Sequence, residues 1–190
     1  MAKMAVRRKA TDDKIFRSAV IEFGINGYSN TTLSKIAISS GVTPGLIVQN
    51  FGSKEELYNR VVKEIFDHLK DAFGSFSSTW DLRYVSIVEY FVNTLNNNPK
   101  AIDYLRFFVT LVTSKDTPDN SKERLHSFYN DSPVEIMIKE GQKRGDVIAG
   151  DPFIINKIFW INMIDNICYC FENKLEYPSS EWFLQTIRKR

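Results

Sequence analysis

Residues 31–47 read TTLSKIAISSGVTPGLI, and this spacing of small, apolar and turn residues predicts two short helices joined by a tight turn. Ala37 is the small residue at the crossing point, and Gly41 supplies a turn that tolerates positive φ. Thr43 is placed to cap the second helix, and Pro44 to occupy its first position. The residues expected in the small core between the helices are Ile36, Val42 and Ile47. The stretch therefore predicts a helix-turn-helix, although an ordinary helical hairpin has similar local spacing.

The rest of the chain also has helical periodicity, and no run shows the sustained alternation of a half-buried strand. The sequence predicts an all-α fold of about nine helices, with an N-terminal three-helix domain followed by a larger helical bundle. A first helix is expected from Thr11, which would cap it, to Gly27, which would stop it. The later expected helices span 32–39, 44–50, 53–73, 80–97, 101–114, 121–144, 152–172 and 180–190.

The charge of the chain is distributed unevenly. The 190 residues contain 25 Lys and Arg against 23 Asp and Glu, which gives a net charge of +2. Residues 1–60 carry a net charge of +4 and residues 61–190 a net charge of −2, while the aromatic residues are concentrated in the second part. The 2 cysteines are too few for a disulfide-stapled secreted scaffold. We therefore expect a basic domain over residues 1–60 and an aromatic-rich domain over residues 61–190.

The segments on either side of the helix-turn-helix extend the pattern. Residues 25–32 (INGYSNTT) precede it, and residues 50–57 (NFGSKEEL) follow it with a capping box between Ser53 and Glu56. Across about residues 12–60 the chain resembles the N-terminal DNA-binding domain of the TetR (tetracycline repressor-like) family. A second similarity to the family lies in residues 140–148 (EGQKRGDVI), which Asp151 and Pro152 follow. The resemblance implies a homodimeric bacterial transcriptional regulator, usually a repressor, that small ligands release from DNA.

The resemblance also identifies candidate DNA-binding residues, with the recognition helix beginning at Pro44. Gln49 can pair with adenine, and Leu46 or Val48 can contact a thymine methyl group. The full set is Thr31, Thr32, Lys35, Thr43, Pro44, Gly45, Leu46, Val48, Gln49, Asn50 and Lys54, of which Thr31, Thr32, Lys35 and Lys54 are expected to contact phosphates.

The recognition helix departs from the family pattern at Val48, Gln49 and Asn50, where members usually have Tyr followed by His or Tyr. The basic N-terminal arm contains Lys3, Arg7, Arg8 and Lys9. It is either a mobile DNA contact or a solvated tail.

The aromatic residues of the second domain have two interpretations, as an ordinary core or as the lining of an apolar ligand cavity. The resemblance favours a cavity, and the candidate ligand-binding residues are Tyr84, Tyr104, Phe107, Phe108, Phe128, Trp160 and Met163.

The helix over residues 153–171 is apolar nearly all round, which indicates burial against both its own bundle and a partner chain. The candidate dimer-interface residues are Phe153, Phe159, Asn162, Asn166, Trp182, Phe183 and Ile187. Asn162, Asp165 and Asn166 share one face of this helix. This polar face has three interpretations: a solvated stripe, polar pairs at the dimer interface or the polar anchor of a pocket.

Several other classes of protein have little support. The polar residues within 153–171 make a membrane-spanning helix unfavourable, so a cytoplasmic protein is expected. His68 and His126 are the only histidines, and there is no Gly-rich phosphate loop or HExxH motif, so we expect no enzyme. Cys168 and Cys170 would project to opposite sides of a helix, and no metal or other cofactor is expected.

The sequence therefore predicts a sequence-specific DNA-binding transcriptional regulator, a repressor released from its operator by a small, largely apolar ligand. Its expected partners are double-stranded DNA with a near-palindromic operator, a second copy of itself and an unknown small-molecule effector. One alternative is a helical small-molecule carrier or an enzyme whose basic head is incidental. Another is a DNA-binding activator.

Overall fold

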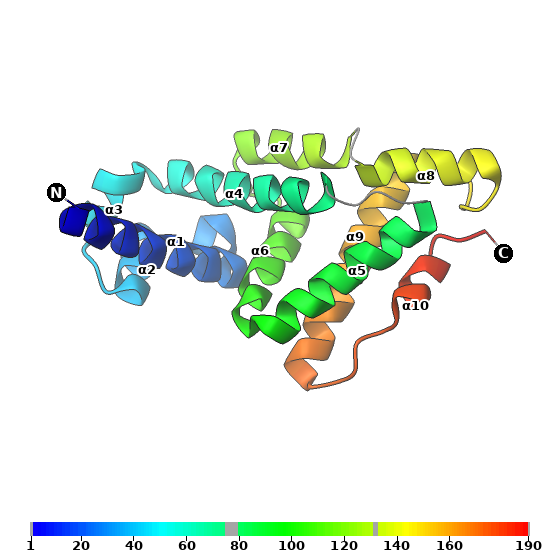
Figure 1. Ribbon diagram of the computed structural model, residues 1–190. Coiled ribbons are helices and arrows are strands. Elements are labelled where there is room, and N and C mark those ends of the chain that lie inside the picture. Colours follow the sequence, from blue (N-terminus) through cyan, green and yellow to red (C-terminus); the bar gives the residue numbers. More distant parts are fainter. Residues whose placement is uncertain (1, 75–79, 131–132, 190) are drawn as a thin grey trace. The chain divides into compact units, whose positions relative to one another are not determined.

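The computed structural model describes the backbone of residues 2–74, 80–130 and 133–189, and the side chains of residues 6–71, 86–130 and 134–189. These residues form ten α-helices and one short 3-10 helix (Figure 1). They are α1 (Ala2–Asn30), α2 (Leu33–Ser40), α3 (Pro44–Phe51), α4 (Lys54–Gly74), α5 (Trp80–Asn97), η1 (Pro99–Ala101), α6 (Ile102–Thr113), α7 (Asp119–Tyr129), α8 (Pro133–Arg144), α9 (Pro152–Asn173) and α10 (Ser180–Gln185). Within the described ranges the one β-type contact is an isolated bridge between Val147 and Arg188. The prediction of an all-α fold is confirmed.

The helices divide into two compact units. The first contains Met1–Ile65 and Arg106–Arg124, and the second contains Phe66–Leu105 and Leu125–Arg190. Helices α4, α6 and α7 each contribute residues to both units. None of the helices in the described part of the chain has the length and apolar character that crossing a bilayer requires.

In the first unit, α6 approaches α1 closely at a glycine. A Cβ atom at Gly24 would lie 3.1 Å from the backbone nitrogen of Phe107, so a larger residue there would push α6 away. The Thr110 hydroxyl donates a hydrogen bond of 2.7 Å to the Gly24 carbonyl. Tyr58 packs between Phe23 and Phe107, with ring-centroid distances of 4.9 and 5.4 Å. Helix α1 therefore shares its core with α4 and α6.

The core of the second unit is an aromatic cluster around Trp160 of α9, which is fully buried. The Trp160 ring lies 5.8 Å from that of Phe91 and 5.5 Å from that of Phe128, and Phe128 stacks on Phe66 at 4.6 Å. Asn156 is fully buried one turn before Trp160, and its amide donates to the Tyr129 carbonyl at 3.1 Å. Burial raises the pKa of the Tyr129 hydroxyl above its ordinary value.

Three of the predicted helix boundaries are wrong. The first helix begins at Ala2 rather than Thr11, because residues 2–10 are mostly good helix formers, and the Thr11 hydroxyl donates to the Arg7 carbonyl within the helix. The predicted helix 121–144 is two helices, α7 and α8, and Pro133 occupies the first position of α8. The last helix ends at Gln185, because the following residues bond to the segment after α8, for example through the Ile148 amide and the Ile187 carbonyl at 2.9 Å.

The predicted stop at Gly27 is met only as an interruption: the backbone there is non-helical, with φ 72°, but α1 continues to Asn30. The predicted start of α9 is confirmed. Asp151 caps α9 by accepting a hydrogen bond of 2.8 Å from the Phe153 amide, and Pro152 occupies the first helical position.

Candidate nucleic-acid interface

Helices α2 and α3 form the predicted helix-turn-helix. Gly41 ends α2 in the left-handed region at φ 68°, and its amide bonds to the carbonyls of α2. The Thr32 hydroxyl caps α2 by accepting from the Lys35 amide at 3.2 Å, and the Thr43 hydroxyl caps α3 by accepting from the Leu46 amide at 3.3 Å. The small core between the helices contains the buried residues Ile36, Ala37 and Ile47. The predicted roles of Gly41, Thr43 and Pro44 in the turn are confirmed.

Helix α3 has a buried face and an exposed face. Ile47 and Phe51 are buried, and Leu46 and Asn50 are half-buried at the edges of that side. The exposed face consists of Pro44, Gly45, Val48 and Gln49. Among the residues predicted to lie on the recognition helix, these four are therefore the ones best placed to enter a DNA groove.

Asn50 connects α3 to α1. Its side-chain amide donates a hydrogen bond of 2.7 Å to the carboxylate of Asp12, a residue 38 positions earlier in the chain. A hydrogen bond to an ionised carboxylate is stronger than one between neutral groups. Asn50 therefore orients the recognition helix rather than reaching outward, which differs from its predicted role in DNA contact. Nothing in the sequence pattern indicates this pairing, because the two residues meet only through the fold.

Lys54, at the start of α4, holds the turn between α1 and α2. Its Nζ donates to the carbonyls of Tyr28 at 3.0 Å and Thr31 at 3.1 Å, and it lies 4.1 Å from the centre of the Tyr28 ring. Partial burial, with a smaller effect from the negative charge of Glu55, raises the pKa of the Tyr28 hydroxyl. The ammonium group that the sequence assigns to a phosphate thus has two backbone acceptors and an aromatic face within the protein.

Thr31 and Lys35 differ in how accessible they are to a phosphate. Thr31 is fully buried, and its hydroxyl lies 3.0 Å from the Glu22 carbonyl and 2.8 Å from the Gly27 carbonyl, to which it donates. The prediction that Thr31 contacts a phosphate is therefore wrong for the free protein, since no surface of this side chain is available. Lys35 is exposed, with its Nζ 3.0 Å from the Asn30 carbonyl, and Thr32 is exposed at the cap of α2.

The corner between α3 and α4 depends on Gly52 and on the predicted capping box. Gly52 has φ 78°, and a Cβ atom there would clash with the Glu56 carboxylate. That carboxylate accepts from the Ser53 amide at 2.7 Å, while the Ser53 hydroxyl accepts from the Glu56 amide at 3.1 Å. The hydrogen bond from the Ser53 amide lowers the pKa of Glu56, so the box forms with an ionised carboxylate. The capping-box prediction is confirmed.

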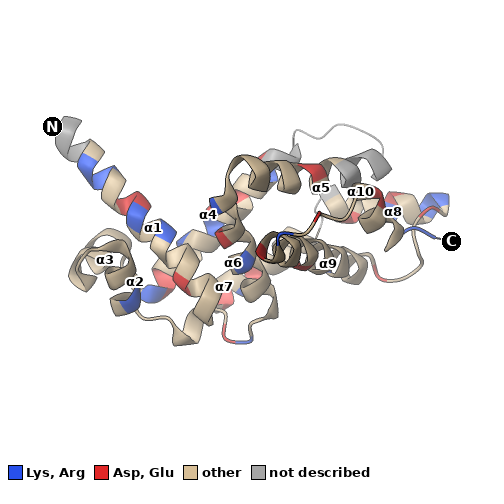
Figure 2. Ribbon diagram, turned by 90° about the horizontal axis from the view of Figure 1, so that it is seen from below, with Lys and Arg blue, Asp and Glu red and all other residues tan. Residues whose placement is uncertain are grey.

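Basic residues lie along the N-terminal half of α1, which runs past α3 (Figure 2). Arg7, Arg8 and Lys9 are exposed, and they belong to a continuous helix rather than a mobile arm. The side chain of Lys3 lies outside the described residues. Arg8 and Lys9 precede Asp12 by four and three positions, which places them on the side of α1 that bonds to α3.

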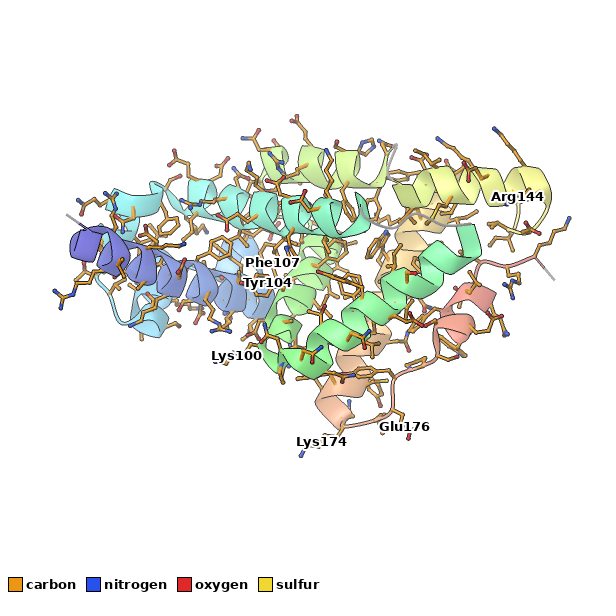
Figure 3. The ribbon with its side chains drawn as sticks, viewed as in Figure 1. Lys100, Tyr104, Phe107, Arg144, Lys174 and Glu176 are labelled. Atoms are coloured by element: carbon orange, nitrogen blue, oxygen red, sulfur yellow. The ribbon has the colours of Figure 1, made fainter. Side chains whose placement is uncertain are left out.

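The predicted ligand residues do not form one group. Tyr104 and Phe107 lie one turn apart on α6 (Figure 3), but Phe107 and Phe108 are buried in the first unit and Tyr104 belongs to the second. Phe107 packs on Tyr58 and is thus a core residue of the unit that contains the helix-turn-helix. Of the members in the second unit, Trp160 and Met163 are buried and Phe128 is half-buried. The side chain of Tyr84 lies outside the described residues.

The predicted dimer residues also separate by burial. Phe159, Phe183 and Ile187 are only 1–2% exposed in the single chain, so they are core residues that offer almost no surface to a partner. Phe153, Asn162 and Asn166 are half-buried, whereas Trp182 is 45% exposed. Within α9 the Asn166 amide donates to the Asn162 carbonyl at 2.8 Å. Sequence reasoning missed the exposed apolar residues of α9, namely Ile154, Ile158 and Tyr169.

Replacing Lys54 with Met is expected to lower the free energy of unfolding by about 1.5–3 kcal/mol, because the Tyr28 and Thr31 carbonyls lose a charged donor. Urea denaturation followed by circular dichroism measures the change. Lys35→Met is the matched control, since this exposed ammonium has one backbone acceptor and its loss should have a smaller effect. Equal stability of the Lys54→Met variant and the unmodified protein would contradict the holding role of Lys54.

Comparisons with known proteins agree with this geometry. Residues 15–61 match the family model described as "Bacterial regulatory proteins, tetR family". The chain is 25% identical over 144 residues to the biofilm operon icaADBC HTH-type negative transcriptional regulator IcaR of Staphylococcus aureus, covering 67% of this chain and 74% of that protein.

Two solved structures share the fold. A TetR family transcription regulator from Marinobacter aquaeolei VT8 has a TM-score of 0.74 at 16% identity, covering 98% of this chain and 100% of that one. The transcriptional regulator FadR from Bacillus subtilis, in complex with stearoyl-CoA, has a TM-score of 0.64 at 19% identity, covering 90% and 95%. The family-model match over residues 15–61 and the similarity to IcaR, together with the helix-turn-helix and its capped flanks, support a TetR family regulator.

Proposed function

We propose that this protein is a homodimeric transcriptional repressor that binds operator DNA through α3 and leaves it when a small, largely apolar ligand binds. The observation that carries the proposal is the exposed face of α3, held by capped helix ends and by the hydrogen bond between Asn50 and Asp12. IcaR is named a negative transcriptional regulator, which supports repression over activation. The role proposed is regulatory rather than catalytic, and its place is the cytoplasm, where bacterial DNA lies.

We assign residues 1–60 to DNA binding and residues 61–190 to ligand binding and dimerisation. The recognition helix enters the major groove, and the positive charge of α1 supplies contacts to the phosphate backbone. Arg8 and Lys9 are suited to this role, because they are exposed and lie about one turn from the residue that bonds to α3. Two such heads on a dimer would fit a near-palindromic site with half-sites about one helical turn apart, or a multiple of it.

The ligand is proposed to bind within the second unit, at the aromatic cluster around Trp160. Phe91 and Phe128 supply apolar surface, and the buried amide of Asn156 supplies a polar group of the kind that orients a ligand. The FadR structure contains stearoyl-CoA, which supports a ligand with a long apolar chain. Release from DNA requires that the ligand bind more tightly to the form of the dimer with low DNA affinity.

The dimer surface is proposed to lie on the exposed face of α9 and on α10. Ile154 and Ile158 are 47% and 57% exposed, and Tyr169 is 60% exposed on the same side of α9. Trp182 of α10 adds a further exposed aromatic side chain. Apolar side chains that recur on one helix face are typical of a surface that a second protein chain covers.

Replacing Arg8 and Lys9 together with Gln is expected to weaken binding to cognate and random duplexes alike, because phosphate contacts do not read sequence. The slope of log affinity against log salt should decrease by about one for each lost contact. Fluorescence anisotropy with DNA from upstream of the protein's own gene, over a range of salt concentrations, measures both. The double variant Lys115→Gln and Lys143→Gln has the same loss of charge at two other exposed sites and should bind as the original does. Absence of any DNA binding by the unmodified protein at low salt would overturn the regulator proposal.

Ligand release is tested with a panel of long-chain acyl-CoA esters and free fatty acids added to the DNA complex. A compound that releases the DNA should also change the fluorescence of Trp160, measured in a variant with Trp80→Phe and Trp182→Phe. The matched control is the same variant with compounds of the panel that do not release the DNA, which should leave the Trp160 fluorescence unchanged. The proposed ligand site would be wrong if release occurred without a response from Trp160, and an apolar effector would be wrong if no compound in the panel released the DNA.

Replacing Ile158 with Arg is expected to convert the dimer to a folded monomer, because a charged side chain would replace an apolar one in the proposed interface. Sedimentation velocity measures the mass of the assembly. The affinity for DNA should fall when the dimer is lost. Ile136→Arg on α8 is the matched control, since Ile136 is also exposed, at 44%, but lies outside α9 and α10. If Ile158→Arg remained dimeric, the assignment of this face would be wrong.

A further inference from the structure

The exposed face of α3, consisting of Pro44, Gly45, Val48 and Gln49, has a chemistry that discriminates among base pairs. The helix reads PGLIVQNF and contains no Lys or Arg in any of its eight residues. Recognition of guanine in the major groove depends mainly on Arg or Lys, which donate to its O6 and N7 atoms. Helix α3 therefore has no side chain of the usual guanine-binding kind.

The groups that α3 does expose are those that recognise adenine and thymine. Gln49 is exposed, and its carboxamide can donate to N7 and accept from N6 of one adenine. Val48 is 50% exposed, although its aliphatic side chain gains nothing from water, and it is suited to contact a thymine methyl group. Since the two residues are consecutive and on the same exposed face, they would reach neighbouring base pairs.

The other two residues of α3 that were candidates for base contacts, Asn50 and Leu46, make contacts within the protein. Asn50 has its amide 2.7 Å from the Asp12 carboxylate, and Leu46 is half-buried toward the core. Apart from Pro44 at the first helical position, Val48 and Gln49 are therefore the residues of α3 with exposed side chains.

Gly45 supplies a second, independent observation. It lies one turn before Val48 and Gln49 on the exposed face, and a Cβ atom built there would have no neighbour within 4 Å. Its backbone conformation does not require glycine either, because Gly45 is absent from the residues with positive φ. Glycine in a helix costs stability relative to alanine. Since the protein itself gives no reason for this glycine, close approach of α3 to a duplex accounts for it.

Building on the proposed function, we propose that each operator half-site contains an A·T-rich core that α3 reads, with Gln49 on adenine and Val48 on the methyl group of a neighbouring thymine. Helix α3 makes no guanine contact. Gln49 and Val48 are the specificity-determining residues, whereas the basic residues of α1 determine affinity without sequence preference.

The test is selection of bound sequences from a random duplex library, followed by affinity measurements on the selected half-site. The unmodified protein is expected to enrich adjacent A·T pairs, and Gln49→Ala should lose the preference at one of them, with a decrease in affinity of about 10-fold. Replacing single thymines with uracil removes only the methyl group. At one position this change should weaken binding by the unmodified protein about 3- to 10-fold and leave Val48→Ala unaffected.

The matched control is Ile38→Ala, which removes an apolar side chain that is 82% exposed on α2 rather than on α3 and should leave the selected sequence unchanged. Because all three replaced side chains are exposed, thermal unfolding should confirm intact folding of each variant. Enrichment of G·C pairs at the positions sensitive to Gln49 or Val48 would overturn the base assignment and leave the regulator proposal intact. Uracil substitution that leaves the affinity unchanged at all positions would likewise overturn the base assignment and leave the regulator proposal intact. Failure to bind any duplex at low salt would overturn the proposed function itself.

Discussion

The position of α3 depends on its attachment to α1. A helix of eight residues is too short to be stable in water, where isolated helices below about 12 residues are marginal. Ile47 and Phe51 bury its inner side, and the hydrogen bond from Asn50 to Asp12 fixes its C-terminal end. With these contacts the outer side is presented in one orientation, which a DNA-binding surface requires.

The same first unit uses several polar contacts to hold the chain segments between its helices. Lys54 donates to the Tyr28 and Thr31 carbonyls at the turn after α1, and the buried hydroxyl of Thr31 lies within hydrogen-bond distance of the Glu22 and Gly27 carbonyls. Gly24 lets α6 approach α1 so closely that Thr110 bonds to its carbonyl. Groups that resemble DNA contacts in the sequence therefore maintain the geometry of the surface that remains for DNA.

Much of the fold could be predicted because its determinants are local. Gly41, Thr43 and Pro44 define the turn through backbone conformation and capping, and the Ser53–Glu56 box defines the start of α4. The helix boundaries that were wrong involve weaker local signals or distant partners. Thr11 has the chemistry of a cap but lies within a longer helix, and the end of α10 is determined by pairing with residues near Val147.

The candidate site was less predictable than the fold. The residues of the recognition helix could be predicted, because the helix-turn-helix follows from the spacing of its glycines, caps and apolar residues. Which of these residues are exposed follows from the folded chain, since burial and hydrogen bonding depend on partners far along the sequence. Asn50 is taken by Asp12, Thr31 by carbonyls of α1 and Lys54 by the turn at Tyr28, while Val48 and Gln49 remain free of such contacts on the outer face. A short-range pattern specifies a helix, but the face that the helix presents is set by what packs against its other side.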